Sequence, residues 1–364
     1  MTSQQRKTIG AAALIGSVLI AVAGCAPAPA ETGGTGDAAS DFKPCIVAQV
    51  GGFDDRAFNE LNLEGLMEAA DELGVETGQA ESDGSDQYAG NITAMLDNGC
   101  TLIETIGFDM ADATREAAEA NPDTEFVLVD STLSDADGEP LELDNVKPVL
   151  FNTAEASYLA GYVAAAASKT GTVGTFGGLQ IPPVTAFMDG FAQGVEKYNE
   201  AHGTDVGVVG WDYAAQNGLF IGDFVDTTKA ANFTQSLIDQ GADVIMPVAG
   251  TLVGSAASAA RDSGAAVFLI GVDSDQYVLY PDYEDLFLTS VLKNMQISTK
   301  DVVLAAADDD FDSSIYTGTI ANGGVGIADL YTNADAVAAE VLDEVAELQD
   351  QIADGTLVIA TGGQ

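Results

Sequence analysis

The first side chains able to do chemistry follow the apolar run Cys45 to Val50. They are Asp54, Asp55, Phe58 and Asn59, and they stand at the start of an expected helix. Carboxylate and amide groups hydrogen-bond neutral hydroxyls, and a phenyl ring stacks on a flat base. Two structural alternatives stay open, because Asn59 could cap the helix and Phe58 could staple its first turn.

Three further polar residues each close an apolar run. They are Asp130, Asp273 and Lys293, and two carboxylates with one ammonium could hold the hydroxyls of a neutral polyol. Asp273 could instead cap a turn, and Lys293 could pair with a surface acid. These groups do not form an obvious catalytic set.

The sequence has few residues that could form a histidine-based catalytic site or a metal site. His202 is the only histidine, and no spacing of Cys, His and acids suggests a metal site. The pair Gly177-Gly178 could cradle a phosphate, but no lysine stands nearby and Pro182-Pro183 follows. We therefore expect no catalysis, no metal and no cofactor.

The elements that must position these residues alternate regularly between strand and helix. Continuous apolar strands indicate parallel sheets that helices cover on both faces. A first series contains strands 45–50, 79–81, 102–106 and 126–129 with helices 59–73, 86–96 and 111–120. A second series contains helices 154–168, 184–198, 228–240 and 253–262 with strands 172–175, 207–211, 244–248 and 267–272. The predicted fold class is α/β, with two doubly wound parallel-sheet lobes and a cleft between them.

The net charge of the chain argues against partners that carry phosphate groups. The chain carries 12 basic and 57 acidic residues, for a formal net charge of -45. Such a surface repels phosphate backbones, so nucleic-acid binding and phosphorylated ligands are not expected. Most of the carboxylates are interpreted as solvated surface.

The N-terminus has the pattern of a bacterial lipoprotein signal. Arg6 and Lys7 precede an apolar run that ends in Val22-Ala23-Gly24-Cys25, and the run is too short to span a membrane. We expect residues 1–25 to be the signal, Cys25 to carry the lipid, and residues 26–42 to be a flexible tether. The protein is then held on the extracytoplasmic face of the cell membrane. Cys45 and Cys100 remain as a possible disulfide, and their pairing stays open.

Several motifs, taken together and in order from about Lys43 to Asp329, resemble the basic membrane protein family of substrate-binding lipoproteins of ABC transporters. The motifs are Asp55-x-x-Phe58-Asn59, Gly107-Phe108, Pro122-Asp123 to Asp130, Glu155 to Gly161, Gly177-Gly178 with Phe187-x-x-Gly190-Phe191, Gly271 to Gln276 and Thr289-Ser290-Val291-x-Lys293.

The resemblance implies a type I periplasmic-binding-protein fold with a nucleoside, usually a purine nucleoside, in the cleft. By motif, Phe58 would stack on the base, and Asp55 or Asn59 would bond its edge. Asp273 and Lys293 would hold ribose hydroxyls. Further candidates are Asp130 for the cleft and Phe187 or Tyr213 for a second aromatic face.

The same resemblance predicts the division into lobes. The first would comprise residues 43–152 and 290–319, and the second residues 153–289 and 320–364, with crossings near Asn152, Thr289 and Ile320. The expected partners are a nucleoside and a membrane permease, and the protein is expected to be a monomer. Two alternatives remain: a binding protein for a sugar or signalling furanose, and a nucleoside hydrolase, which would need more clustered aspartates than Asp54 and Asp55.

Overall fold

The computed structural model describes residues 42–361. The predicted signal, the lipid site Cys25 and nearly all of the predicted tether lie outside the described residues. Within residues 42–361, none of the helices has the length and apolar character needed to cross a bilayer.

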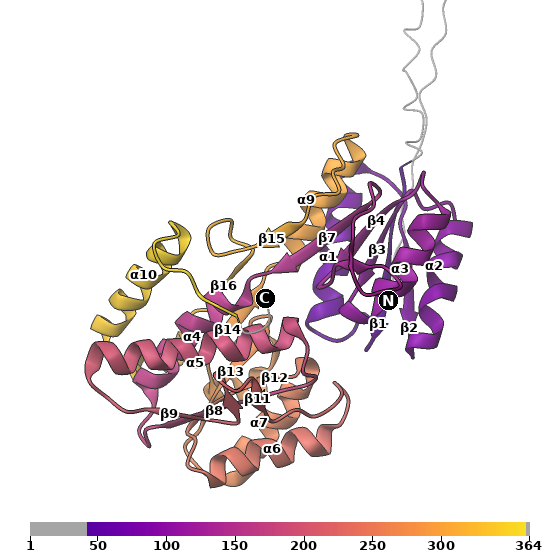
Figure 1. Cartoon of the computed structure of the whole chain (residues 1–364). Coiled ribbons are helices and arrows are strands. Elements are labelled where there is room, and N and C mark those ends of the chain that lie inside the picture. Colours follow the sequence, from indigo (N-terminus) through magenta and orange to yellow (C-terminus); the bar gives the residue numbers. More distant parts are fainter. Residues whose placement is uncertain (1–41, 362–364) are drawn as a thin grey trace, which may run out of the picture. The chain divides into compact units, whose positions relative to one another are not determined.

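The first lobe is a six-stranded parallel sheet with the order β15-β7-β4-β3-β1-β2 (Figure 1). Its strands are β1 Pro44–Val50, β2 Gly78–Ser82, β3 Leu102–Ile106, β4 Glu125–Val129, β7 Val146–Phe151 and β15 Tyr316–Gly318. One face packs against helices α1 Phe58–Leu73 and α9 Met295–Ala307, and the other against α2 Tyr88–Asp97 and α3 Ala111–Ala120. Burial on both faces explains why β1 and β4 are predominantly apolar.

The second lobe is a six-stranded sheet with the order β16-β14-β13-β12-β8-β9. Its strands are β8 Thr172–Gly177, β9 Gly207–Val209, β12 Val244–Val248, β13 Phe268–Asp273, β14 Phe287–Lys293 and β16 Val325–Ile327. Helices α4 Thr153–Ala167, α5 Pro182–His202 and α10 Ala339–Ala353 pack on one side, and α6 Thr227–Asp239 and α7 Val253–Ser263 on the other.

The prediction of two doubly wound sheets is confirmed, with two corrections. The second sheet is mixed, because β16 pairs antiparallel with β14. The predicted strand 207–211 is divided at Gly210, whose φ of 89° turns the chain. Trp211 then begins a separate hairpin of β10 Trp211–Asp212 and β11 Asn217–Gly218. The other small elements are β5 Leu133–Ser134, β6 Pro140–Leu141 and α8 Gln276–Leu279.

The chain passes three times between the two sheets, and the crossing segments hydrogen-bond to one another. The first crossing lies at Asn152, whose N–H donates to the Gly318 carbonyl at 2.8 Å. The second lies at Asn294, whose N–H donates to the Gly324 carbonyl at 2.9 Å. β14 stays in the second sheet to Lys293, so the chain leaves it four residues later than the expected point near Thr289. The third crossing is the segment 319–324 between β15 and β16.

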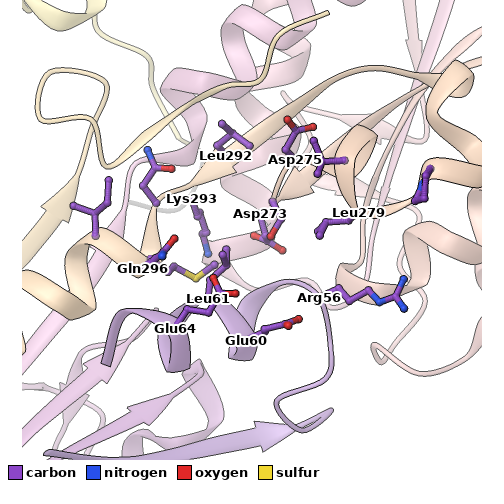
Figure 2. Close-up of a pocket in the computed structure, with 16 residues that line it drawn as sticks. Arg56, Glu60, Leu61, Glu64, Asp273, Asp275, Leu279, Leu292, Lys293 and Gln296 are labelled. Carbon is purple, nitrogen blue, oxygen red and sulfur yellow. The ribbon is translucent and has the colours of Figure 1, made fainter. Parts of the chain in front are cut away.

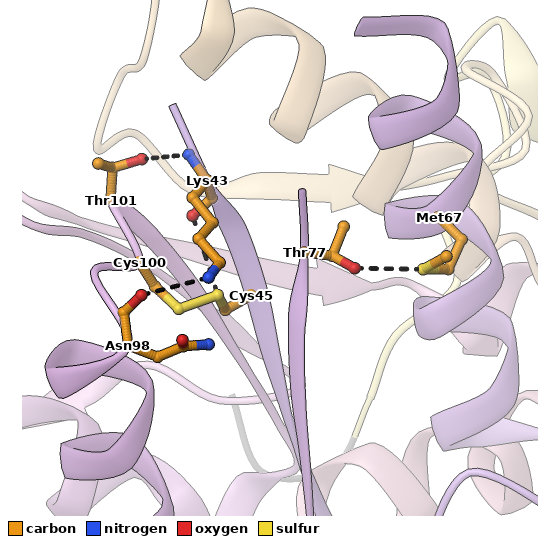
Figure 3. Close-up of a disulfide and its surroundings, with 7 residues drawn as sticks. All are labelled: Lys43, Cys45, Met67, Thr77, Asn98, Cys100 and Thr101. Carbon is orange, nitrogen blue, oxygen red and sulfur yellow. Dashed lines mark hydrogen bonds between the residues drawn. A yellow bond between two sulfur atoms is a disulfide. The ribbon is translucent and has the colours of Figure 1, made fainter. Parts of the chain in front are cut away.

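A disulfide joins Cys45 in β1 to Cys100 just before β3, with the two Cα atoms 5.9 Å apart (Figure 3). The neighbouring Lys43 donates its backbone N–H to Thr101 Oγ1 at 2.9 Å and its ammonium to the Asn98 carbonyl. Lys43 and β1 are therefore joined to the segment just before β3 by one covalent bond and two hydrogen bonds.

Helices α4 and α5 approach each other through glycines. A Cβ at Gly161 would run into the backbone of Phe191, one at Gly190 into Ala154, and one at Gly194 into Tyr158. Backbone contacts of this kind leave no room for even a methyl group.

Gly190→Ala is therefore expected to destabilise the protein by about 1–3 kcal/mol, because the two helix backbones must separate. Gly90→Ala is the matched control, since Gly90 lies in the exposed part of α2 and nothing approaches its missing Cβ. The control is expected to be neutral or to stabilise by up to about 1 kcal/mol. Urea unfolding of both variants measures the difference, and equal stabilities would contradict this account of the helix pair.

Candidate functional site

Asp55 fixes the loop that follows β1. Its carboxylate accepts the backbone N–H groups of Ala57 at 3.0 Å, Asn59 at 2.9 Å and Glu60 at 3.1 Å. It therefore satisfies the free N–H groups at the start of α1, where the helix dipole also favours a negative charge. The cap of this helix comes from Asp55, so the alternative that Asn59 is its N-cap is wrong.

Asp130 and Asp273 occupy matching positions in the two lobes. Each stands at the carboxyl end of its strand, β4 or β13, with a left-handed backbone whose φ is 61° and 67° respectively. Such conformations cost energy in any residue other than glycine and gather at functional sites. The turns direct both carboxylates toward Lys293, the last residue of β14.

The Lys293 ammonium is almost fully buried, with 3% of the residue exposed. It forms an ion pair with Asp130. It also lies 5.0 Å from the ring centroid of Phe58, 5.4 Å from that of Phe151 and 5.8 Å from that of Phe187. Phenyl faces attract a cation, and a buried ammonium needs such partners to offset the loss of water.

A cavity of about 620 Å³ lies between the lobes, and all seven residues proposed from the sequence as ligand contacts line it. These residues are Asp55, Phe58, Asn59, Asp130, Phe187, Asp273 and Lys293. The first four come from the first lobe and the others from the second. Two carboxylates, those of Asp130 and Asp273, thus lie beside one ammonium in a cavity that also contains phenyl rings.

The phenyl rings come from both lobes. Phe58 and Phe108 belong to the first, and Phe187 and Phe224 to the second. Phe187 is 2% exposed and belongs to the core beneath α5, whereas Phe224 is only partly buried. Tyr213, the alternative to Phe187, packs partly buried against that core and is not among the described residues that line the cavity.

The sequence prediction missed Phe224, although it singled out the glycine pair Gly177-Gly178, against which the loop that carries Phe224 lies. A Cβ at Gly177 would collide with the Phe220 ring, and one at Gly178 with the Phe224 ring. Two backbone hydrogen bonds hold the loop with Phe220 and Phe224 in place. The Ile221 N–H donates to the Gly177 carbonyl, and the Gly222 N–H donates to the Gly178 carbonyl. The two glycines therefore provide the surface on which this aromatic loop rests. Gln49 and Thr251 also line the cavity and were not predicted.

A second cavity, of about 690 Å³, shares Asp273 and Lys293 with the first (Figure 2). Figure 2 shows Glu60, Leu61 and Glu64 of α1 on one side of this pair. Asp275 and the exposed Val278 of the second lobe also line this cavity. The Asp273 and Lys293 pair therefore separates two open spaces.

The pKa of Asp273 is raised. Burial raises the pKa of its carboxyl to about 6, while Lys293 lowers the pKa and the neighbouring Asp130 and Asp55 raise it. Desolvation thus outweighs the single ammonium, which Asp130 already neutralises. Among residues 42–361 there is no group of three His, Cys, Asp or Glu side chains arranged to hold a metal ion.

This titration predicts how stability depends on pH. Between about pH 4 and pH 6 the folded protein keeps a proton on Asp273 that the unfolded chain has released, so stability falls as the pH rises through that window. Asp273→Asn removes this fall and is expected to raise stability at pH 7 by about 1–3 kcal/mol. Asparagine tolerates the left-handed backbone at this position.

Thermal unfolding of wild type and variant from pH 4 to pH 7, without ligand, measures the difference. Asp282→Asn serves as control, because Asp282 is exposed and outside both cavities. Parallel pH profiles for wild type and Asp273→Asn would show that Asp273 is ionised throughout.

Comparison with known proteins agrees with this architecture. Residues 42–360 match the family model described as ABC transporter substrate-binding protein PnrA-like. The chain is 30% identical to the "ABC transporter nucleoside-binding protein BmpA" of Lactococcus lactis subsp. cremoris, over 98% of this chain and 99% of that one. It is also 30% identical to "Basic membrane protein A" of Borreliella burgdorferi, over 68% of each.

Among solved structures, an ABC transporter solute-binding protein from Aeropyrum pernix superposes with a TM-score of 0.76 at 24% identity, covering 89% of this chain and 94% of that one. The match to the family model spans nearly all of the described residues, and the fold is that of solute-binding proteins. The chain therefore belongs to the Bmp family of PnrA-like ABC transporter substrate-binding proteins, the family that its motifs resemble.

Proposed function

We propose that this substrate-binding protein captures a nucleoside, with a purine base, in the cavity between its lobes and delivers it to an ABC importer. The observation that carries the proposal is that one cavity holds two kinds of group. Lys293 lies there with Asp130 and Asp273, and phenyl rings from both lobes line the same space, with the centroid of the Phe58 ring 5.0 Å from the Lys293 ammonium. A nucleoside offers a partner for each kind of group, a polyhydroxylated sugar and a flat apolar base.

The sugar would bind at the charged end. Carboxylates accept hydrogen bonds from hydroxyls and an ammonium donates to them, and each such charged hydrogen bond is worth about 1.5–3 kcal/mol. Asp273 is well suited to this role, because its carboxylate has Lys293 beside it while Asp130 takes the ion pair. The excess of acid at this end also disfavours a phosphorylated ligand.

The base would bind between aromatic faces. Phe58 supplies the first face, and Asp55 or Asn59 lies close enough in the chain to bond the edge of the base. Phe187 and Phe224 compete for the second face. We favour Phe224, because a ring that is 2% exposed, as Phe187 is, presents little surface for stacking.

Capture would involve closure of the lobes. The three crossings are short and lie side by side, joined by the hydrogen bonds of Asn152 and Asn294, which is the arrangement expected of a hinge. The closed form would be the one that the permease recognises. Cys25 would hold the monomeric receptor to the extracytoplasmic face of the membrane, which keeps it at high local concentration near its permease.

Catalysis is not part of the proposal. The chain belongs to a family of substrate-binding proteins. Of the six aspartates that line the cavity, Asp55 is committed to the helix cap and Asp130 to Lys293. A hydrolase would convert the nucleoside to base and sugar, so incubation with purified protein followed by chromatography checks this point.

Calorimetric titration of residues 42–364 with nucleosides, free bases, pentoses, hexoses and nucleoside monophosphates tests the ligand class. We expect binding of guanosine, adenosine or inosine, weaker binding of the bases and none of the monophosphates. If a free pentose or hexose bound and no nucleoside did, the protein would instead be a sugar receptor.

Lys293→Met tests the sugar half. The variant keeps an apolar stem but loses the donor, and we expect nucleoside affinity to fall by about 1.5–3 kcal/mol, which is at least about tenfold in Kd. Affinity for the free base should change much less. Lys300→Met is the control, because Lys300 pairs with Glu68 and Glu72 outside the cavity. Equal losses for base and nucleoside would contradict the assignment of Lys293 to the sugar.

Phe224→Leu tests the base half. Loss of stacking is expected to weaken nucleoside and free base alike, by about 0.5–1.5 kcal/mol beyond the lost area. Phe220→Leu is the matched control, since Phe220 lies on the same loop against Gly177 and is not among the described residues that line the cavity. If Phe224→Leu left the nucleoside affinity unchanged and Phe187→Leu lowered it, the second aromatic face would belong to Phe187.

A further inference from the structure

Glu104 is a buried carboxyl group for which the nucleoside cavity has no use. It stands in the middle of β3, 1% exposed, between Ile46 of β1 and Val127 of β4. The alternation of β3 turns its side chain toward α1 and α9, on the same side as Leu102 and Ile106. An acid at such a position must find hydrogen-bond partners within the protein.

The partners of Glu104 are too few for an ionised group. Oε1 accepts from the Thr299 hydroxyl at 2.8 Å, and Oε2 has no partner and no exposure to water. The charged side chains of the packed helices all stand at exposed or half-exposed positions: Glu60, Glu64, Glu68, Asp71 and Glu72 on α1, and Lys300 and Asp301 on α9. A buried carboxylate supported by one shared hydroxyl and no cation would be very costly.

Counting protons leads to the same conclusion. The Thr299 hydroxyl lies 2.8 Å from Glu104 Oε1 and 3.0 Å from Asn62 Oδ1, but it has one proton for two acceptors. The orientation of the Asn62 amide is fixed, because its Nδ2 donates to the Phe58 carbonyl at 2.6 Å. A flipped amide would place oxygen against that carbonyl oxygen. The two contacts of the Thr299 hydroxyl therefore lack one proton if Glu104 is ionised, and both are hydrogen bonds if Glu104 is protonated.

We propose that Glu104 carries that proton and acts as a positioning residue: it donates to Thr299, which donates to Asn62, which holds the carbonyl of Phe58 at the cavity wall. Burial, which raises the pKa of Glu104 to about 8, acts in the same direction. The role in ligand binding rests on the proposed function, because Phe58 matters only if the ligand occupies that cavity.

The three elements that this chain of hydrogen bonds connects are also packed tightly. Gly65 of α1 lies directly on the backbone of Gln296 in α9, with no room for a Cβ. α9 begins two residues after Lys293, at the second crossing. The buried chain therefore fixes the first turn of α1, which carries Phe58 and Asn59, to the segment that leaves the charged end of the cavity.

Four variants test the proposal. Glu104→Gln keeps a donor in the place of the carboxyl proton, and Glu104→Met removes the donor at similar volume. Thr299→Val removes the hydroxyl, and Thr299→Ser restores it. Guanosine, adenosine and inosine are the probes, and circular dichroism with thermal unfolding establishes that each variant is folded.

We expect Glu104→Gln and Thr299→Ser to bind within about twofold of wild type, and Glu104→Met and Thr299→Val to bind about tenfold more weakly. The double variant Glu104→Met/Thr299→Val should be little worse than either single variant, because both break the same chain. A Glu104→Gln variant as weak as Glu104→Met, or a folded Glu104→Met variant with wild-type affinity, would overturn the positioning role.

Infrared difference spectra of wild type and Glu104→Gln at pH 7, without ligand, test the proton itself. A carbonyl band of a protonated carboxyl group, lost in the variant, supports the proposal, and a difference confined to carboxylate bands overturns it. This readout is independent of the ligand. Wild-type protein that binds none of the probes would contradict the proposed function, whereas wild-type binding with no effect of Glu104→Met contradicts the positioning role alone.

Discussion

One buried ammonium organises the space between the two lobes. Lys293 ends β14, the last strand before the second crossing, and its charge lies between Asp130 at the end of β4 and Asp273 at the end of β13. Removing a lone ammonium from water is prohibitively costly, so the lobes must approach closely enough for the ion pair and the phenyl rings to surround it. The carboxyl ends of two separate sheets are thereby brought to one site, which neither sheet could form alone.

The chain handles buried acids in different ways, although its surface is overwhelmingly acidic. Asp55 is satisfied by three N–H groups at a helix start, and Asp130 by an ion pair. Asp273 has a raised pKa and opens onto the cavity, and Glu104, in our proposal, keeps its proton. The difference reflects what surrounds each carboxyl group. Asp55 lies at a helix start, Asp130 beside a cation, and Asp273 at a cavity that a polar ligand could enter. Glu104 lies beside a hydroxyl whose only proton is needed by another acceptor.

The regular part of the fold could be predicted because its signals are local. Buried parallel strands such as β4, from Phe126 on, and β12 are continuous apolar runs, and α1 has helical spacing that ends at Gly74, whose φ is 67°. The crossing elements β15 and β16, three residues each, have no such signal, since they exist only through pairing with β7 and β14. The sequence analysis did not predict α9, although this helix completes the core over α1. It also placed the second crossing near Thr289, four residues early, because sequence periodicity does not show which sheet a strand joins.

The sequence by itself determined the alternation of strands and helices, the family, and seven of the residues that line the cavity. Six of the seven follow or end predicted strands, whose carboxyl ends share one edge of a parallel sheet, and Phe187 came from the family resemblance. Tertiary structure alone decided which partners those side chains have. It assigned Asp55 to the helix cap, placed Phe224 against Gly178, and excluded Tyr213 from the described cavity wall. These outcomes depend on contacts between segments far apart in the chain, such as Asp130 with Lys293 and Glu104 with Thr299, and no local pattern specifies such distances.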